Sequence, residues 1–491
     1  MRLATTALVV ALTAFLTSCG SGGEAGGAAD VVPADVAVYA SVDADFEGDE
    51  WQAVEELAAR FPGGENLLQS LADEAEGDVD FERDVLPALG PELVLVLLEL
   101  EPAATAEPSA VGEEPFVVLL QPHDEAAFDR LVAESEEEIV VGEVEGWRVL
   151  TERQEWLDRF QAGLDGPRLD DSEDFQRAMD GLDESSLARV FVNGASLQAA
   201  AEADARAGTA LRLLPGGQVP SFGLALHAED DGARLDGRAV LAGESPFAGE
   251  PYEADLPEEV PGDVLAYVSF NDLESAVSAY RDLAAEADPE AEAQLGMAEG
   301  LLGLSLEEDV APLLAGEGAL YVRRGAAFPE VTLVTRVEDD ESAVATLDEI
   351  ASVLGAFDGR FGEPRRTEVD GVEVRELQLD APFSLFYTAF EDLLVVTTSR
   401  EGIAALREDD DRLADDDAFE EAADRARLPD ETEGFGYVDL AEALPLFLAH
   451  AKSGEAAAEE ARTYLDPLES LVFYGNAEGE TASFTVFLSV E

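Results

Sequence analysis

Four side chains are the best candidates for nucleophilic or metal chemistry in this sequence: the single cysteine Cys19 and the histidines His123, His227 and His450. Histidine is the commonest general base, and a zinc site needs several ligands close together. The three histidines are far apart in the chain, so we expect each to have a structural role. The sequence also lacks a G-x-S-x-G elbow, a P-loop and a dinucleotide fingerprint in a strand–turn–helix context. We therefore predict no catalytic residue, no metal site and no cofactor, and a protein that is not an enzyme.

Carboxylates are too common to indicate a catalytic pair, because the chain has 109 Asp and Glu residues. The densest acidic runs are Glu134–Glu138 and Glu408–Asp417. The second run lacks the glycine at the sixth position and the closing glutamate of an EF-hand loop. We expect a solvated acidic surface at both runs, with weak, non-specific cation binding as the alternative.

Cys19 follows a short export signal. Arg2 gives a positive start, Leu3 to Leu16 form an apolar stretch too short for a comfortable transmembrane span, and Thr17-Ser18 precede the cysteine. The segment Leu16-Thr17-Ser18-Cys19 resembles the lipobox of bacterial lipoproteins, in which the cysteine thiolate accepts a diacylglycerol group. The resemblance implies a signal peptide over residues 1–18, lipidation (palmitate or a similar acyl chain) at Cys19 and Sec/Tat-type export to the outer face of the cell membrane. A flexible Gly/Ser/Ala tether is expected over residues 19–30.

The charge of the chain restricts its partners. The 109 acidic residues face only 29 Lys and Arg, for a net charge of −80, and Lys452 is the one lysine. Such a surface repels nucleic acid and anionic lipid headgroups, so the expected membrane contact is through the lipid on Cys19. The self-repulsion of a compact acidic body is best tolerated in concentrated salt, where charges are screened over about 3 Å. The composition therefore predicts halophilic adaptation.

The part of the chain after the tether contains an internal repeat. Four segments recur in the same order at offsets of 225 to 244 residues, which is too long a period for a solenoid. The pairs are Pro33–Tyr39 with Pro261–Tyr267, Phe81–Pro87 with Leu306–Pro312, Glu143–Val149 with Glu368–Val374, and Arg168–Phe175 with Arg412–Phe419. We predict two homologous domains at residues 31–245 and 258–491, joined by a linker at residues 246–257. The growing offset predicts an additional strand pair near Phe383–Thr397 in the second copy.

Each repeat mixes strand and helix patterns. Alternating apolar residues predict strands at Val36–Val42, Leu93–Leu98, Phe116–Leu120 and Trp147–Leu150, and Asp370-Gly371 predicts a type I′ hairpin turn. Helical spacing covers Glu125–Ala133, Ser342–Leu354 and Leu440–Ala451. Strands adjoin hairpin turns more often than crossover helices, so the predicted fold class is α+β, with a largely antiparallel sheet covered by helices in each domain. Four polar residues that end strands are expected to cap the next helix: Asp43, Asn193, Asn271 and Asp439.

The layout resembles an uncharacterised bacterial family, domain of unknown function 3352, whose members are secreted or membrane-anchored. The opening strand pattern of that family is matched at Pro33–Asp43 and, with Asn in place of the last Asp, at Pro261–Asn271. The resemblance would cover nearly all of the chain after the signal, and it implies no activity and no functional residue.

Two functions are compatible with the sequence. The first is a non-enzymatic envelope or surface interaction module, anchored by lipid and presenting two domains to an unknown protein partner. The second is a membrane-proximal carrier or sensor of an apolar ligand, because ligand pockets favour domain interfaces. The apolar stretches Phe383–Tyr387 and Leu444–Leu448 could line such a site, although core packing is the default interpretation of both.

Overall fold

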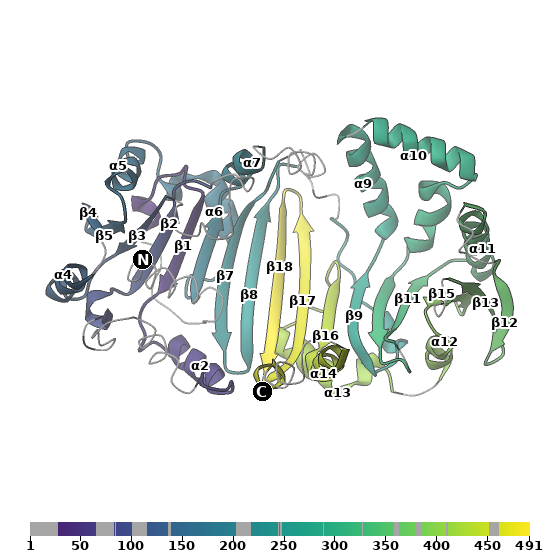
Figure 1. The fold of residues 1–491 in the computed structure, drawn as a ribbon. Helices are drawn as coiled ribbons and strands as arrows, with labels where there is room; N and C mark the ends of the chain where they lie inside the picture. Colours follow the sequence, from purple (N-terminus) through teal and green to yellow (C-terminus); the bar gives the residue numbers. More distant parts are fainter. Residues whose placement is uncertain are drawn as a thin grey trace. The chain divides into compact units, whose positions relative to one another are not determined.

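The computed structural model describes residues 28–64, 83, 85–100, 115–135, 139–202, 218–243, 245, 248–287, 289–326, 328–357, 363–379, 384–408, 411–450 and 461–491. Packing divides the chain into two compact units, residues 1–243 with 480–491 and residues 244–479. Both units are α+β and are built on an antiparallel sheet (Figure 1). The predicted domain boundaries were drawn from the repeats and stay a prediction. The last strand, β18, packs with the first unit.

The sheet of the first unit has the strand order β4-β5-β3-β2-β1-β6-β7-β8-β18, with every described pairing antiparallel. The strands are β1 (Val38–Asp43), β2 (Glu92–Leu97), β3 (Phe116–Leu120), β4 (Val140–Val144), β5 (Trp147–Thr151), β6 (Ala188–Val192), β7 (Ser221–Glu229), β8 (Gly232–Val240) and β18 (Thr481–Val490). The helices are η1 (Ala29–Val31), α2 (Asp49–Ala58), η4 (Leu86–Ala88), α4 (Glu125–Glu134), α5 (Gln154–Gly163), η5 (Leu169–Asp171), α6 (Glu173–Met179) and α7 (Gly194–Glu202).

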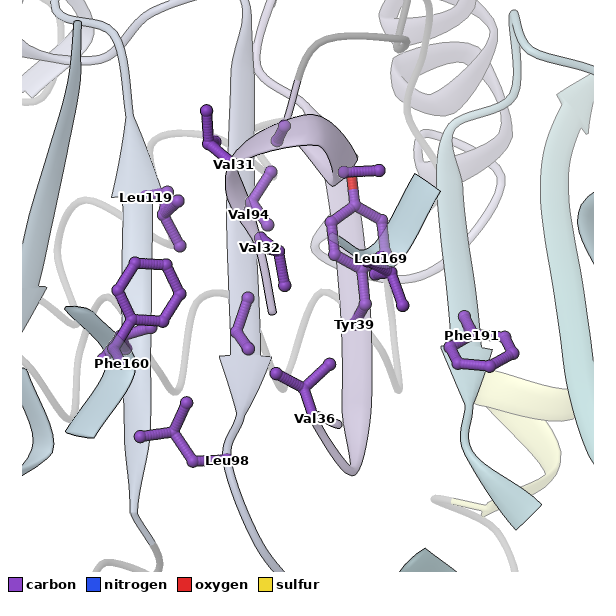
Figure 2. Close-up of a cluster of buried hydrophobic side chains, with 14 of the residues drawn as sticks. Val31, Val32, Val36, Tyr39, Val94, Leu98, Leu119, Phe160, Leu169 and Phe191 are labelled. Atoms are coloured by element: carbon purple, nitrogen blue, oxygen red, sulfur yellow. The ribbon is translucent and has the colours of Figure 1, made fainter. Parts of the chain in front are cut away.

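The main core of the first unit lies on one face of this sheet. The helix α5 contributes Trp156, Leu157 and Phe160, which pack with strand residues such as Leu119. Figure 2 shows part of this cluster, in which Tyr39, Val94 and Leu119 come from three neighbouring strands. A smaller cluster uses Leu120, the next residue of β3, together with Phe128 of α4. Because successive strand residues point to opposite faces, α5 and α4 cover opposite faces of the sheet.

The sheet of the second unit has the order β12-β13-β14-β15-β11-β10-β9-β16-β17, again antiparallel throughout its described pairings. The strands are β9 (Val264–Phe270), β10 (Gly318–Arg323), β11 (Glu330–Arg336), β12 (Arg365–Val369), β13 (Val372–Gln378), β14 (Ser384–Phe390), β15 (Leu393–Thr397), β16 (Phe435–Asp439) and β17 (Leu468–Glu478). The helices are η7 (Leu256–Glu258), α9 (Leu273–Ala287), α10 (Pro289–Leu302), η8 (Leu306–Val310), η9 (Ala311–Leu314), α11 (Asp340–Phe357), α12 (Arg400–Arg407), η10 (Leu413–Asp415), α13 (Asp417–Ala426) and α14 (Leu440–His450).

The two faces of the second sheet are covered by different helices. On one face, Tyr267, Tyr321 and Tyr437 lie in register across β9, β10 and β16 and are fully buried. Phe419 of α13 contacts the ring of Tyr437 at a centroid distance of 5.2 Å. On the other face, α11 packs Ala351 against Tyr387 of β14. The predicted strand pair near Phe383–Thr397 is confirmed as β14 and β15, with Phe383 itself outside the described residues.

Two of the recurring sequence segments make the same contact in each unit. Pro33 forms an isolated β-bridge with Arg168, and Pro261 forms one with Arg412. The next residue after each arginine, Leu169 or Leu413, donates its backbone N–H to the carbonyl oxygen of a buried valine at 2.8 Å and 2.9 Å respectively. Both leucines are fully buried. In each unit these segments therefore fix the chain just before the first strand.

A third recurring segment forms a hairpin in each unit. Glu145-Gly146 joins β4 to β5, and Asp370-Gly371 joins β12 to β13. All four residues have positive φ, as the predicted type I′ turn requires, and glycine adopts this conformation without a steric penalty. In the second unit β14 and β15 are inserted between this hairpin and β11, whereas in the first unit β5 pairs directly with β3.

The capping predictions are half correct. Asn193 accepts hydrogen bonds from Ala195 N at 3.0 Å and Ser196 N at 3.4 Å, and Asp439 accepts one from Glu442 N at 2.9 Å. Asp43 instead accepts from Asp45 N at 2.9 Å, because α2 starts six residues later, after Gly48. The cap of α9 is Asp272 rather than Asn271: Asp272 has a left-handed φ of 50°, and its carboxylate accepts the Ser275 N–H at 3.2 Å.

Candidate interaction surface

The helices α9 and α10 form a hairpin held together by charges on its inner side. Arg281 of α9 lies 3.1 Å from Glu292 and 2.9 Å from Glu299 of α10, with Glu307 of η8 at 3.6 Å. The side chains of Arg281 and Glu299 are only 17% and 16% exposed, so this pair is largely shielded from water. Glu299 also accepts the Leu306 N–H at 2.9 Å. That hydrogen bond is the main cause that lowers the pKa of Glu299.

The outward side of α10 carries apolar residues and glycines. Residues three and four apart lie on one side of a helix. That spacing groups Ala293, Gly296, Met297, Gly300 and Leu301, and all five are exposed. Met297 and Leu301 lie opposite the glutamates that bind Arg281, whereas Gly296 borders those glutamates. The side chains of Met297 and Leu301 are 68% and 75% exposed. We call these five residues the α10 face.

The orientation of α10 is the reverse of an ordinary surface helix, which turns its apolar stripe inward and its charges to water. Here Glu292 and Glu299 point to Arg281, while Met297 and Leu301 point to solvent. In Figure 1, α10 forms the upper border of the second unit, next to α9. A chain with a net charge of −80 has many carboxylates that could keep a helix soluble, so the exposure of two large apolar side chains on one side of α10 indicates a contact surface.

A second apolar surface lies on the sheet of the same unit. Leu320, Val268 and Gly436 are directly paired across β10, β9 and β16, and Phe473 of β17 pairs with Gly436. Leu320 is 43% exposed, Val268 38% and Phe473 37%. The same row continues to Tyr387, where α11 covers it. The row is therefore covered at one end and accessible in the middle of the sheet.

Buried carboxylates mark the sheet of the first unit. Glu92 of β2 is directly paired with Asp43 of β1, and Ser41 and Arg189 are paired nearby across β1 and β6. Burial raises the pKa of Glu92 to about 7, opposed mainly by the positive charge of Arg189. A carboxyl group with such a pKa could in principle act as a general acid or base. It lies between paired strands beside another buried carboxylate, however, which indicates a structural group with a pH-dependent charge.

The second unit has a buried glutamate at the matching position. Glu317 directly precedes β10, is 8% exposed, and lies at the same offset of 225 residues from Glu92 as the recurring segments near it. Its carboxylate accepts the Leu256 N–H at 2.8 Å and the Arg336 Nε–H at 3.2 Å. Burial raises its pKa. With both oxygens held by donors from the fold, this side chain fixes η7 to the sheet.

Several predicted site residues lie apart or outside the described residues. Cys19 and the signal peptide are outside them, as is the side chain of His450. His123 is exposed before α4, whereas His227 is buried in β7, and burial lowers its pKa. Of the acidic runs, Glu136–Glu138 and residues 409–410 are outside, and Asp416 caps α13 by accepting the Phe419 N–H. Within the described ranges, no cluster of three or more His, Cys, Asp or Glu residues could hold a metal ion. In the same ranges, every helix is too short or too polar to span a membrane.

The apolar stretches proposed to line a ligand site are divided between core and surface. Phe386 and Tyr387 are 7% and 4% exposed, so this part of the first stretch belongs to the core. Phe447 of α14 is 73% exposed. The α10 face was not predicted from the sequence, although two glycines four residues apart with Met297 and Leu301 beside them are a signal that the sequence contains.

Comparison with known families identifies the chain. Residues 154–490, well over half of the sequence, match the family described as "Protein of unknown function (DUF3352)". The chain belongs to this family. The matched part of this DUF3352 protein includes Pro261–Asn271 and α10, whereas Pro33–Asp43 precedes it. A search of curated proteins finds no match.

Among solved structures, the DUF3352 protein is similar to crystal forms of TP0453. Form III has a TM-score of 0.25 at 11% identity and covers 45% of this chain and 73% of that chain. Form IV has a TM-score of 0.25 at 11% identity, with 46% and 76% covered. Form I has a TM-score of 0.17 at 10% identity, with 77% and 95% covered. TM-scores this low define no common fold, and no argument below depends on them.

Proposed function

We propose that this DUF3352 protein is a lipoprotein of the outer face of the cell membrane, anchored through Cys19, and that it acts as a non-enzymatic interaction module. The α10 face is its contact surface for a protein partner. The single observation that carries this proposal is the reversed orientation of α10, with its glutamates on Arg281 and its Met297 and Leu301 in water.

The anchor is inferred from the sequence before the folded part. An export signal that ends in Leu16-Thr17-Ser18-Cys19 supplies one thiol at the cleavage point, and the described chain is packed from Ala28 onward. Two acyl chains give stable anchoring, at about 0.8 kcal/mol for each buried CH₂ group. The eight residues from Gly20 to Gly27 would then separate the acidic body from the lipid headgroups.

Duplication accounts for the two units. The matching Pro–Arg bridges, the matching glycine hairpins and the buried glutamates at one offset support an origin from one ancestral domain. The helical hairpin α9–α10 follows the first strand of the second unit, at the position that α2 occupies after β1 in the first.

In-cell photo-crosslinking tests the proposed contact surface. A photoreactive amino acid at Leu301 should crosslink the protein to a discrete partner band in intact cells. The same amino acid at Glu401, an exposed position on α12 of the same unit, is the matched control and should give no such band. A Leu301 probe that yields only uncrosslinked protein would refute the assignment of α10 as the contact surface.

The accessible row Leu320, Val268 and Phe473 favours a second candidate function, a carrier or sensor of an apolar ligand. Mass spectrometry of the purified protein tests it. A stoichiometric lipid that is lost when Leu320 is changed to Ser would support the carrier. A purified protein without bound lipid would refute the carrier, and the interaction module would remain the proposed function.

A further inference from the structure

We propose that the free edge of β12 binds an extended acidic segment of a partner protein by strand addition, with Arg365 and Arg366 as its charged contacts. This edge is a different surface from the α10 face, so it adds a second contact to the proposed function and can be tested separately.

The edge of β12 presents unpaired backbone groups. Among the described strands β12 pairs with β13 alone, and Figure 1 shows it at the outer end of the second sheet. The two-residue turn Asp370-Gly371 makes Val369 and Val372 a hydrogen-bonded pair, and bonded and non-bonded pairs then alternate along the hairpin. The N–H and C=O groups of Arg366 and Glu368 therefore point away from β13. Such groups at an open sheet edge can pair with the backbone of an added strand.

The side chains at this edge are basic in an acidic protein. β12 and α12, which packs on it, together have four arginines and two glutamates, a charge of +2 in a chain that carries −80. Arg365 and Arg366 are both exposed. Arg366 lies 3.4 Å from Glu373, but both side chains are mostly in water, so this pair is weak. Arg365 makes no ion pair with any described residue, and Arg400 holds the cross-strand neighbour Glu376 at 2.7 Å.

The first unit shows that this edge does not require arginine. Its equivalent strand β4 pairs with β5 alone among the described strands. Val140 and Val141 lie there at the offset of 225 residues from the two arginines, and Val141 is 38% exposed. Charged side chains often protect sheet edges from pairing, yet the same hairpin carries valines in the first unit. The arginines of β12 therefore indicate a ligand of opposite charge.

The geometry of the edge specifies the ligand. Arg365 and Arg366 point to opposite faces of the sheet, because successive strand residues alternate. Two adjacent acidic residues on the added strand would alternate in the same way and meet both arginines. The carboxylate of Glu368 disfavours a further acid at the other end, so neutral residues should follow the acidic pair. With so few outward backbone groups, we expect a dissociation constant on the order of 100 µM.

A labelled synthetic peptide tests this binding by fluorescence anisotropy. The peptide has about eight residues, an Asp-Glu pair followed by alternating valine and threonine, and it is titrated with the exported chain carrying Cys19→Ser in about 0.5 M NaCl. Binding should saturate, and an Asn-Gln pair in the peptide should weaken it about fivefold or more. Arg365→Gln combined with Arg366→Gln in the protein should have the same effect.

Proline substitutions separate strand addition from charge attraction alone. Glu368→Pro removes an outward N–H group at an edge position, where proline is tolerated, and should abolish binding. Glu143→Pro makes the same change at the equivalent position of β4, 225 residues earlier, and should leave binding unchanged.

Three outcomes would overturn the inference. Equal affinity for the acidic and neutral peptides excludes recognition by charge, and saturable binding that survives Glu368→Pro excludes strand addition. A protein that binds neither peptide, and that self-associates in sedimentation velocity once Arg365 and Arg366 are changed to Val, would show that the arginines only protect the edge. The Leu301 crosslinking probe reports on the α10 face alone, so the proposed function can stand if β12 fails, and the reverse.

Discussion

The buried carboxyl group of Glu92 should make the stability of the first unit fall as the pH rises. Burial raises its pKa from 4.5 to about 7, so the folded state favours the neutral form. A carboxyl group whose pKa is higher in the folded state than in the unfolded state stabilises the fold fully when the pH is below its unfolded pKa. This stabilisation is lost as the pH rises through the folded pKa of about 7. Each pKa unit corresponds to 1.36 kcal/mol, which gives a loss of about 3 kcal/mol between pH 4.5 and pH 8.

The substitution Glu92→Gln should remove this dependence, because the amide keeps the size of the side chain and never ionises. The assay is urea unfolding at pH 5 and pH 8 in 2 M NaCl, followed by tryptophan fluorescence. The three tryptophans, Trp51, Trp147 and Trp156, all lie in the first unit, so the signal reports on that unit alone. Between the two pH values, the free energy of unfolding of the variant should fall by about 2 kcal/mol less than that of the wild type.

The control for this prediction is Glu55→Gln, which makes the same change at an exposed position of α2. It should reproduce the pH dependence of the wild type and so correct for the general loss of acidic charge. The free energy of unfolding of Glu92→Gln and Glu55→Gln could instead change equally between pH 5 and pH 8. In that case Glu92 is already ionised in the folded protein at pH 5, and the account of the buried cluster is wrong.

Three further predictions test the repeats, the helical hairpin and the salt response. Leu169→Ala and Leu413→Ala remove equivalent fully buried side chains, so each should destabilise its own unit by about 2–5 kcal/mol in calorimetry, and a loss in only one unit would contradict their equivalence. Arg281→Met leaves Glu292 and Glu299 close together without a cation, and it should speed hydrogen exchange of the α10 amides about tenfold. Unchanged exchange rates would show that the ion pairs of Arg281 do not hold α10 against α9. Thermal melting should occur at a higher temperature in molar NaCl than at low salt, and an equal or lower melting temperature would refute halophilic adaptation.

Much of the fold could be predicted where a local pattern determines the structure. The strand Phe116–Leu120 was predicted from its apolar pattern with its observed bounds, although the structure buries side chains on both of its faces instead of one. The Asp370-Gly371 turn was predicted because its backbone requires positive φ at both positions. The strand pair β14–β15 was found from the change of repeat offset, which needs only the sequence.

Other features depend on contacts between distant residues and could not be predicted in this way. Asp43 follows its strand as Asp439 does, but the chain continues through Asp45 and Gly48 before α2 begins, so the same residue type makes a turn instead of a cap. The exposure of Met297 and Leu301 follows from the pairing of Arg281 with Glu299 eighteen residues away. An apolar residue on a helix is expected to face the core, and only the charged contact on the opposite side of α10 reverses that expectation.

Mass spectrometry of the N-terminus of the protein isolated from cell membranes tests the central claim most directly. The account predicts a mature chain that begins at Cys19, with the mass of a diacylglycerol group on its thiol, and a Cys19→Ser variant that leaves the membrane fraction. A chain that retains Met1, or a membrane-free protein with an unmodified Cys19, would contradict the account of a lipid-anchored module.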